Sequence, residues 1–264
     1  MNDTADFDAA AVARAYAAEV TAELDTVLGG ALTAAYLHGS AALGGWNPAR
    51  SDVDILFVAA DDLSAAAAAK AGQGLISAAG GSPGRGGLEC SVVTASAAAQ
   101  PRPPWPFLLH LGVRDGKQVL YSGRETAGDA DLLIHYAVCR AAGITLTGPP
   151  PQSAIGVVDR PAILRYLADE LSWGLANAPE SYAVLNACRG LVYLRHGKLV
   201  GKAAGGLAAL EDGSGPAGVV RQALEQQLAR APEQNSGPDA VAFVEQVAAA
   251  LTAAAAAPAE SPPE

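Results

Sequence analysis

Basic residues are scarce in this chain: 17 lysines and arginines stand against 27 aspartates and glutamates, which gives a formal net charge of −10. A protein that follows a nucleic-acid backbone needs a basic face to meet the phosphates. The shortage of positive charge therefore argues against nucleic acid as a partner. An acidic chain suits a small substrate that is cationic or that is neutralised by a metal ion.

Cysteines, aromatic residues and long apolar runs are scarce as well. The three cysteines, Cys90, Cys139 and Cys188, lie far apart without a CxxC pair, which is typical of reduced, buried thiols. We find no signal-peptide pattern and no apolar run of the about 20 residues that span a membrane, so we expect a cytoplasmic protein without membrane contact. Aromatic residues make up only 5% of the chain, which favours a helix-rich core with closely packed backbones.

Helix and strand patterns alternate in the first half of the chain. Apolar residues recur at helical spacing over about 7–28, before a Gly-Gly pair. Two strand patterns follow, LTAAYLHG and DVDILFVAA, then an alanine-rich helix and a third strand pattern, GLECSVVT. This order predicts an α/β unit around a small sheet.

A proline run, GPPPQ at residues 148–152, interrupts these patterns, because consecutive prolines neither continue a helix nor pair centrally in a sheet. We place a domain boundary there. Residues 1–150 are predicted to form the first domain and residues 151–257 the second, with a disordered tail over 258–264. The second domain shows only helical patterns and is expected to be an all-helical bundle.

Carboxylates stand where two of the strand patterns begin. Asp52 and Asp54 are two residues apart, so they share one face of a strand. Glu89 stands near the start of the third strand pattern. If these strands are neighbours, the three carboxylates converge, and they stay ionised together only with cations beside them. Oxygen ligands of this kind favour Mg²⁺, which completes its coordination with water and substrate phosphates.

A Gly-Ser pair, Gly39 and Ser40, ends the first strand pattern. Small residues at a strand-to-helix turn let phosphate oxygens approach backbone N–H groups, and the positive end of the following helix favours the anion. The serine hydroxyl adds one donor. A phosphate cradle next to a metal-binding acidic pair predicts a site for a nucleoside triphosphate.

The stretch HGSAALGGWNPARSDVDILFV resembles the signature of the polymerase-β-like nucleotidyltransferase superfamily, in which G-S, a later G and S-D-x-D are separated by spacers. The matching residues are Gly39, Ser40, Gly44, Ser51, Asp52 and Asp54. The likeness narrows to the aminoglycoside 3″/9-adenylyltransferases, which inactivate streptomycin and spectinomycin. Their third carboxylate lies in an LEV-like strand, matched by LEC at 88–90, and NACRGLVYLRHGKLVGKAAGG loosely matches a pattern of their helical domain.

The resemblance spans about residues 30–210. It implies an α+β fold, with a nucleotidyltransferase domain built on a small mixed sheet and followed by an all-helical bundle. It also implies an enzyme that moves AMP from ATP to a hydroxyl and releases pyrophosphate. We expect this enzyme to be a monomer. Asp52, Asp54 and Glu89 would hold Mg²⁺, and Glu89 would take the proton from the attacking hydroxyl. The implied nucleotide-binding residues are Gly39, Ser40, Ser51, Asp131, Arg189 and Lys202.

Trp173 stands where family members that modify streptomycin carry a tryptophan that stacks on the substrate. The following loop, GLANAPES, is shorter than in those members and lacks their paired aspartates, which leaves Glu180 as the local acid. We expect Trp173 and Glu180 to contact an aminoglycoside or aminocyclitol. Spectinomycin is favoured over streptomycin because it has fewer cationic groups to satisfy.

Alternatives to these predictions stay open. The enzyme can instead modify a protein or a tRNA end, although its charge disfavours tRNA, or the fold can bind nucleotide as a non-catalytic sensor. Asp131 can be a helix cap, and Trp173 can pack between domains. The four histidines do not cluster along the sequence, so no zinc site is expected. The glycine-rich stretch at 82–87 is expected to be a connector.

Overall fold

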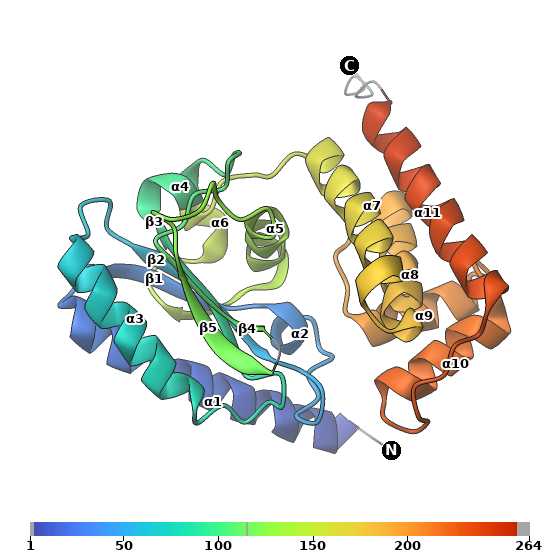
Figure 1. The fold of residues 1–264 in the computed structure, drawn as a ribbon, viewed down its shortest axis with the longest axis horizontal. Helices are drawn as coiled ribbons and strands as arrows, with labels where there is room; N and C mark the ends of the chain where they lie inside the picture. The colour runs from blue at the N-terminus through green and yellow to red at the C-terminus, as the bar shows by residue number, and fades with distance from the viewer. Residues whose placement is uncertain (1–2, 115, 258–264) are drawn as a thin grey trace. The chain divides into compact units, whose positions relative to one another are not determined.

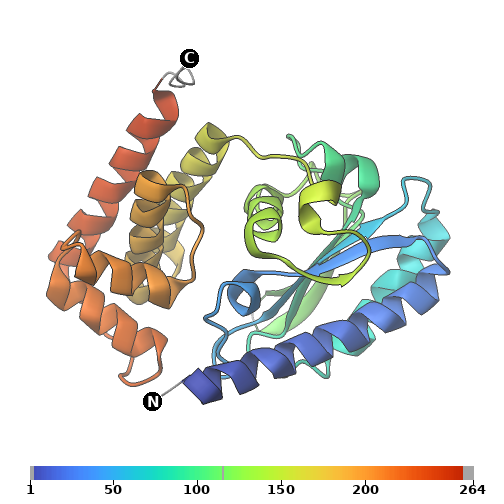
Figure 2. The ribbon, with the colours of Figure 1, turned by 180° about the vertical axis from the view of Figure 1, so that it is seen from behind.

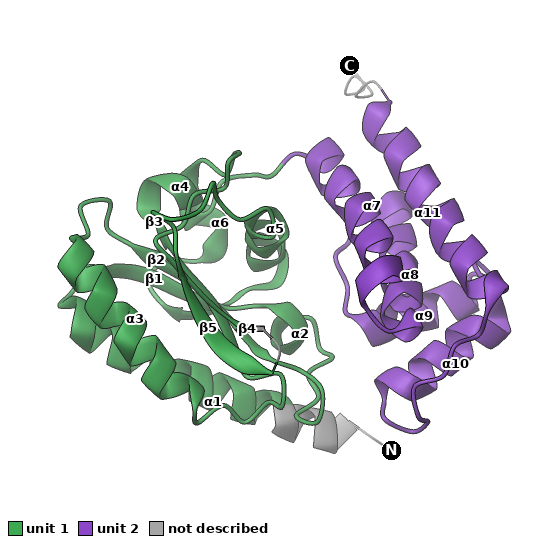
Figure 3. Ribbon diagram, in the orientation of Figure 1, with its two compact units in different colours: residues 1–158 green, residues 159–264 purple. Residues whose placement is uncertain are grey.

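The structure is a computed structural model that describes residues 3–114 and 116–257. It divides into two compact units, Met1–Val158 (unit 1) and Asp159–Glu264 (unit 2), which Figure 3 shows in different colours. Unit 1 contains a sheet and helices, and the described part of unit 2 is entirely helical. The predicted α+β fold class is confirmed. The predicted disordered tail, 258–264, lies outside the described residues.

A six-stranded mixed sheet forms the centre of unit 1 (Figure 1). Its strand order is β5-β4-β3-β2-β1-β6. Only β2 and β3 are parallel, and the other neighbours are antiparallel. The strands are β1 (Leu32–Leu37), β2 (Val53–Ala59), β3 (Leu88–Thr94), β4 (Leu109–Arg114), β5 (Lys117–Ser122) and β6 (Ile144–Thr147).

Helices cover both faces of this sheet (Figures 1 and 2). Helices α1 (Asp3–Leu28) and α3 (Ala65–Ala79) cover one face, and α5 (Leu132–Ala142) lies on the other with the short helices α2 (Gly39–Ala42), α4 (Ala95–Ala99) and α6 (Pro151–Ala154). Since successive strand residues point to opposite faces, Ile55 and Phe57 of β2 enter the core under α1 and α3. Asp54, at an even position of β2, therefore points to the α5 side.

The main hydrophobic core of unit 1 lies between the sheet and helices α1 and α3. It contains Val20 and Leu24 of α1, Leu75 of α3 and the apolar residues of the central strands, all almost fully buried. Burial of this apolar surface stabilises the unit by about 25 cal/mol for each Å² removed from water. All three cysteines are buried and free, as predicted.

The prolines at 149–151 start helix α6, with Pro151 in its first turn. Helix α6 packs against α4 and α5 and lies in unit 1, although the sequence analysis placed it in the second domain. The division between the units follows Val158. The prolines thus position a short helix of the first unit, and Asp159 accepts a hydrogen bond from the Ala162 N–H to cap the first helix of the second.

Unit 2 consists of helices packed around an apolar centre. They are α7 (Arg160–Asn177), α8 (Glu180–His196), α9 (Lys202–Glu211), α10 (Ala217–Gln227) and α11 (Pro238–Ala256). Helix α11 packs against α7 and α8 through buried residues such as Val244 and Leu251. By length and composition alone, α11 is apolar enough to cross a membrane, although we expected no such segment. Its apolarity comes largely from alanine.

Candidate active site

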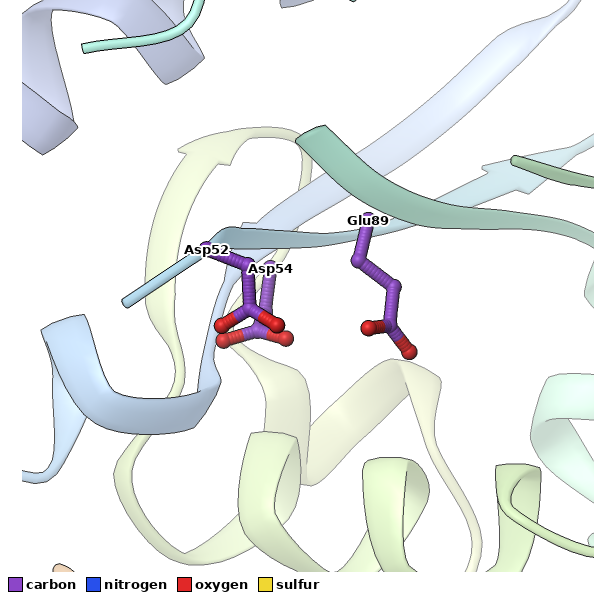
Figure 4. A group of neighbouring side chains, drawn as sticks. All are labelled: Asp52, Asp54 and Glu89. Carbon is purple, nitrogen blue, oxygen red and sulfur yellow. The ribbon is translucent and has the colours of Figure 1, made fainter. Parts of the chain in front are cut away.

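The three predicted carboxylates converge on one face of the sheet (Figure 4). In the parallel pairing of β2 and β3, Asp54 lies directly opposite Glu89. Asp52 precedes Asp54 by two residues and points to the same side. One oxygen from each of the three carboxylates lies within 4.8 Å of the others. We call Asp52, Asp54 and Glu89 the acidic trio.

The electrostatics of the acidic trio favour a bound cation. Burial raises the pKa of Glu89 well above its usual 4.5, and the charges of Asp54, Asp52 and Asp131 raise it further. Carboxylates this close repel one another unless a proton or a cation lies between them. Three partly buried carboxylate oxygens are hard ligands, and they fit Mg²⁺.

Gly39 allows Asp54 to lie against the turn that follows β1. Its φ of 57° is in the left-handed region, which favours glycine. A Cβ atom at this position would lie 1.8 Å from Asp54 Oδ2. The backbone N–H of His38 also donates a hydrogen bond to the Asp54 carbonyl oxygen at 2.9 Å. The Gly-Ser turn and Asp54 are therefore in direct contact.

Ser40 carries a buried hydroxyl that has no hydrogen-bond partner within the described structure. A buried polar group without a partner costs about 1–3 kcal/mol. A phosphate oxygen next to Ser40 would satisfy this hydroxyl. The predicted contact between Ser40 and a triphosphate thus fits the structure.

The loop before β2 is fixed by contacts that place Asp52. Ser51 Oγ accepts a hydrogen bond from the Asn47 N–H at 3.0 Å, and Trp46 Nε1 donates to the Asp52 carbonyl oxygen at 2.6 Å. A Cβ atom at Gly86 would lie 2.6 Å from the Asp52 nitrogen. The glycine-rich stretch that we expected to be only a connector therefore also packs against the backbone of the acidic trio.

Asp131 stands at the start of α5, where its charge acts on Glu89. It occupies the N-cap position of α5, where its side chain makes no capping hydrogen bond. Asp129 instead accepts a hydrogen bond from the Asp131 N–H at 3.0 Å. The charge of Asp131 thus acts on Glu89, and its contact with the nucleotide stays a prediction.

Three of the four histidines gather on the same side of the sheet, which the sequence did not reveal. The rings of His38 and His135 are 4.9 Å apart. His110 Nδ1 lies 2.9 Å from the Ser91 hydroxyl and 3.7 Å from Asp129 Oδ2. Burial lowers the pKa of all three rings, so they are neutral at pH 7. Among the described residues, the acidic trio forms a potential metal-binding group and these histidines do not.

The predicted basic residues of unit 2 have partners within that unit. Arg189 on α8 donates from Nε to the Val200 carbonyl oxygen at 2.8 Å and from Nη1 to Asn186 Oδ1 at 2.7 Å. Lys202 Nζ lies 4.5 Å from the centre of the Tyr182 ring. These contacts hold both cations in defined positions.

Trp173 and Tyr182 form an aromatic pair in unit 2. Their rings meet edge to face with centroids 6.1 Å apart, and Trp173 is 52% exposed. The Tyr182 hydroxyl donates a hydrogen bond to Glu170. Burial and the charge of Glu170 raise the pKa of Tyr182, so it stays protonated at neutral pH. Tyr182 was not among the predicted site residues, although its ring contacts both Trp173 and Lys202.

Glu180 has a different environment from Trp173. Its carboxylate accepts a hydrogen bond from the Ser236 N–H, in the segment that precedes α11. The hydroxyl of the next residue, Ser181, donates to Glu233 in the same segment. Glu180 therefore anchors this segment, and its contact with an acceptor stays a prediction.

No protein-family model and no curated protein matches the sequence. Among solved structures, the chain is similar to the spectinomycin adenyltransferase AAD(9) from Enterococcus faecialis, crystallised with ATP and spectinomycin. The TM-score is 0.63 at 17% sequence identity, over 89% of this chain and 96% of that chain. The two proteins share a fold. The shared fold includes the mixed sheet and the helical region that follows it.

Proposed function

We propose that the protein is an adenylyltransferase, which moves AMP from ATP to a hydroxyl of a small molecule and releases pyrophosphate. The observation that carries this proposal is the acidic trio, whose oxygens lie within 4.8 Å of one another beside the Gly-Ser turn. The adenyltransferase with the same fold, which was crystallised with ATP, supports it independently.

Asp52, Asp54 and Glu89 would hold Mg²⁺, since they supply three carboxylate oxygens on one face of the sheet. The ion would neutralise and orient the phosphates of ATP. Ser40 and Ser51, with the backbone at Gly39, would contact the triphosphate. Asp131, Arg189 and Lys202 would contact the nucleotide. Arg189 and Lys202 would supply positive charge to its phosphates.

Glu89 is the proposed general base. A hydroxyl with a pKa far above 7 attacks slowly unless a base takes its proton in the transition state. The raised pKa of Glu89, caused first by burial and then by the neighbouring acids, makes its carboxylate a stronger base than an exposed one. The proton leaves the acceptor oxygen for Glu89 as this oxygen bonds to the α-phosphorus, and the bond from that phosphorus to the pyrophosphate oxygen breaks.

The proposed acceptor is an aminoglycoside or aminocyclitol, with spectinomycin preferred over streptomycin. The protein of the same fold was crystallised with spectinomycin, and the net charge of −10 suits a cationic acceptor. The half-exposed ring of Trp173 is available for stacking. Glu180 would supply a negative charge to the acceptor. We further propose that the enzyme acts as a monomer in the cytoplasm, where ATP and Mg²⁺ are present.

Pyrophosphate release from ATP tests this proposal. Wild-type protein with Mg²⁺ should release pyrophosphate with spectinomycin and more slowly with streptomycin, and Glu89→Gln should abolish most of the activity. Absence of turnover with either drug would contradict the proposed acceptor. AMP found by mass spectrometry on an added protein or RNA would support the alternative substrates. Tight ATP binding without any transfer would support the sensor.

A further inference from the structure

The start of strand β3 lies where its pairing with β4 stops. The last paired residues of these two strands are Cys90 and Leu111. Strand β4 continues beyond Leu111 and pairs with β5, where Val113 lies opposite Gln118. The hairpin of β4 and β5 therefore extends past β3, and the backbone of Leu88 needs other hydrogen-bond partners on that side.

The side chain of Gln118 supplies these partners. Its amide lies beside the carbonyl oxygens of Leu88 and Gly112 and beside the Leu88 N–H. The nitrogen and the oxygen of an amide have nearly the same shape, so the surrounding groups decide which is which. With its nitrogen toward the two carbonyl oxygens, Gln118 donates to both at 3.2 Å, and its oxygen accepts from the Leu88 N–H at 3.1 Å. These bonds join β3 to β4 where their own pairing has ended.

The residue type at position 118 fits this contact. Two carbonyl oxygens and one N–H group need two donors and one acceptor, which an amide side chain offers. An ionised carboxylate has no donor, and a lysine has no acceptor. The amide also comes close to the backbone before β3, because a Cβ atom at Gly87 would lie 2.6 Å from the Gln118 side chain. Glycine at this position, with a φ of 87°, therefore leaves room for Gln118.

The other side of β3 pairs with β2. The Val53 N–H donates to the Gly87 carbonyl oxygen at 2.9 Å, and the parallel pairing continues along the strand. Glu89 directly follows Leu88, so the bonds from Gln118 and the pairing with β2 hold its backbone from two sides. From this position the Glu89 side chain joins the acidic trio (Figure 4).

We propose that Gln118 is a positioning residue, which holds the start of β3 and thereby keeps the Glu89 carboxylate in place within the acidic trio. Gln118 acts through the backbone of β3 and not by contact with substrate. The proposal rests on the proposed function only for the proton transfer to Glu89. It gives a role in the reaction to β5, a strand at the edge of the sheet that carries no member of the acidic trio.

Residue-resolved amide hydrogen exchange of the full-length protein tests the contact without any substrate. Gln118→Met keeps the length of the side chain and removes all three hydrogen bonds, whereas Gln118→Glu keeps an acceptor for the Leu88 N–H. We expect the Leu88 amide to exchange about ten-fold faster in Gln118→Met, the effect of losing one hydrogen bond, and less than about three-fold faster in Gln118→Glu.

Gln222→Met is the matched control for this measurement. It removes a glutamine side chain of unit 2 that donates to the Gln234 carbonyl oxygen at 2.9 Å. Exchange at Leu88 should stay at the wild-type rate in this variant. Exchange at Leu88 that is unchanged in Gln118→Met, or that accelerates equally in Gln222→Met, would overturn the proposal.

AMP transfer provides the second readout. Misplacing a reacting group by about 1 Å costs up to about 100-fold in rate, so kcat should fall by up to that factor in Gln118→Met while the KM for ATP stays within about two-fold. In a Glu89→Gln background, where no carboxylate remains to be positioned, adding Gln118→Met should cause no further loss of kcat. Losses that add fully, or a rise in KM at constant kcat, would overturn the proposal.

The two readouts separate this proposal from the proposed function. A wild-type protein without AMP transfer refutes the proposed function, and the exchange at Leu88 then decides whether Gln118 holds β3. If Gln118→Met does not fold, Gln118→Glu replaces it in the kinetic test under the same criteria, because it still loses the two donated bonds.

Discussion

The two units hold their charged residues in opposite ways. In unit 1, carboxylates gather within 4.8 Å of one another, and their repulsion adds to burial in raising the pKa of Glu89. In unit 2, Arg189 is hydrogen-bonded to Val200 and Asn186, and Lys202 lies over an aromatic ring. The clustered acids of unit 1 therefore lower the stability of the fold, whereas the contacts of the cations in unit 2 raise it. This difference indicates that the acidic trio is arranged for a ligand, whereas the cations of unit 2 are already part of its packing.

Of all the variants, Glu89→Gln should lower turnover the most, and it should raise the stability of the metal-free protein. We expect kcat to fall by about 10²–10⁴-fold, the usual contribution of a general base. Because the folded protein raises the pKa of Glu89 above 4.5, ionisation of Glu89 destabilises the fold as the pH rises beyond that value. In metal-free buffer, the variant should therefore melt at a higher temperature than wild type at about pH 8. The difference should shrink toward about pH 5, and thermal unfolding at both values measures it.

If Glu89→Gln instead melted at a lower temperature than wild type at about pH 8, the contrast drawn between the two units would be wrong. It would mean that Glu89 stabilises the metal-free fold, as an acid with a lowered pKa does. Asp212→Asn in unit 2 is a suitable control, because Asp212 pairs with Arg195 on the exposed surface. Its removal should change stability little, since exposed ion pairs contribute about 0–1 kcal/mol.

Gly39→Ala should follow with a loss of about 100-fold in kcat/KM, the effect of misplacing a reacting group by about 1 Å. The new Cβ would lie 1.8 Å from Asp54 Oδ2, so the carboxylate has to move. Gly30→Ala is the matched control, since Gly30 also has a positive φ, 87°, but no atom within 4 Å of the added Cβ. It should lose about 1–2 kcal/mol of stability and keep its activity. Equal activity of the two variants would contradict the account.

Arg189→Ala should raise the KM for ATP about ten-fold, the equivalent of one hydrogen bond to a charged group, and should also lower the melting temperature. Both effects are expected because Arg189 would contact phosphate and also holds Val200 and Asn186. Arg189→Lys keeps the charge and loses the paired donors. Compared with Arg189→Ala, it should bring the KM for ATP closer to the wild-type value but restore less of the melting temperature. Steady-state kinetics and thermal unfolding of both variants check this. An unchanged KM would assign Arg189 to packing alone.

Trp173→Ala should have the smallest effect, a roughly 2- to 12-fold rise in KM for the acceptor, which corresponds to about 0.5–1.5 kcal/mol for an aromatic contact. Stability should change little because the side chain is 52% exposed. Tyr182→Phe keeps the ring and removes only the hydroxyl that donates to Glu170, so it serves as the control. A rise in KM for ATP instead of the acceptor would contradict the role of Trp173.

The sequence predicted the parts of the fold that depend on short spacings. The strands β1 to β3 and the acidic trio follow from side chains that alternate between the faces of a strand. The hairpin of β4 and β5 was missed because a proline-rich stretch precedes it, although an Asp-Gly pair stands between the strands. The short strand β6 was also missed.

The spacing of residues along the sequence could not predict contacts between residues that are far apart in the chain. His38 and His135 meet because His38 precedes α2, which packs against the helix α5 that carries His135. His110 on β4 approaches Asp129, which lies 19 residues later in the segment before α5. Trp46 and Gly86 support Asp52 through backbone contacts that leave no periodic signal in the sequence. Tyr182 could have been noticed, since it is an aromatic residue one turn into the helix that carries Arg189.

The most direct test of the central claim is thermal unfolding during a titration with Mg²⁺ alone. If the acidic trio binds the ion, wild-type protein gains about 2.7 kcal/mol of stability at a Mg²⁺ concentration 100 times the Kd. Asp54→Asn should gain far less, and Arg189→Ala should gain as much as wild type. A wild-type melting temperature that does not respond to Mg²⁺, or an Asp54→Asn variant that responds equally, would contradict the claim.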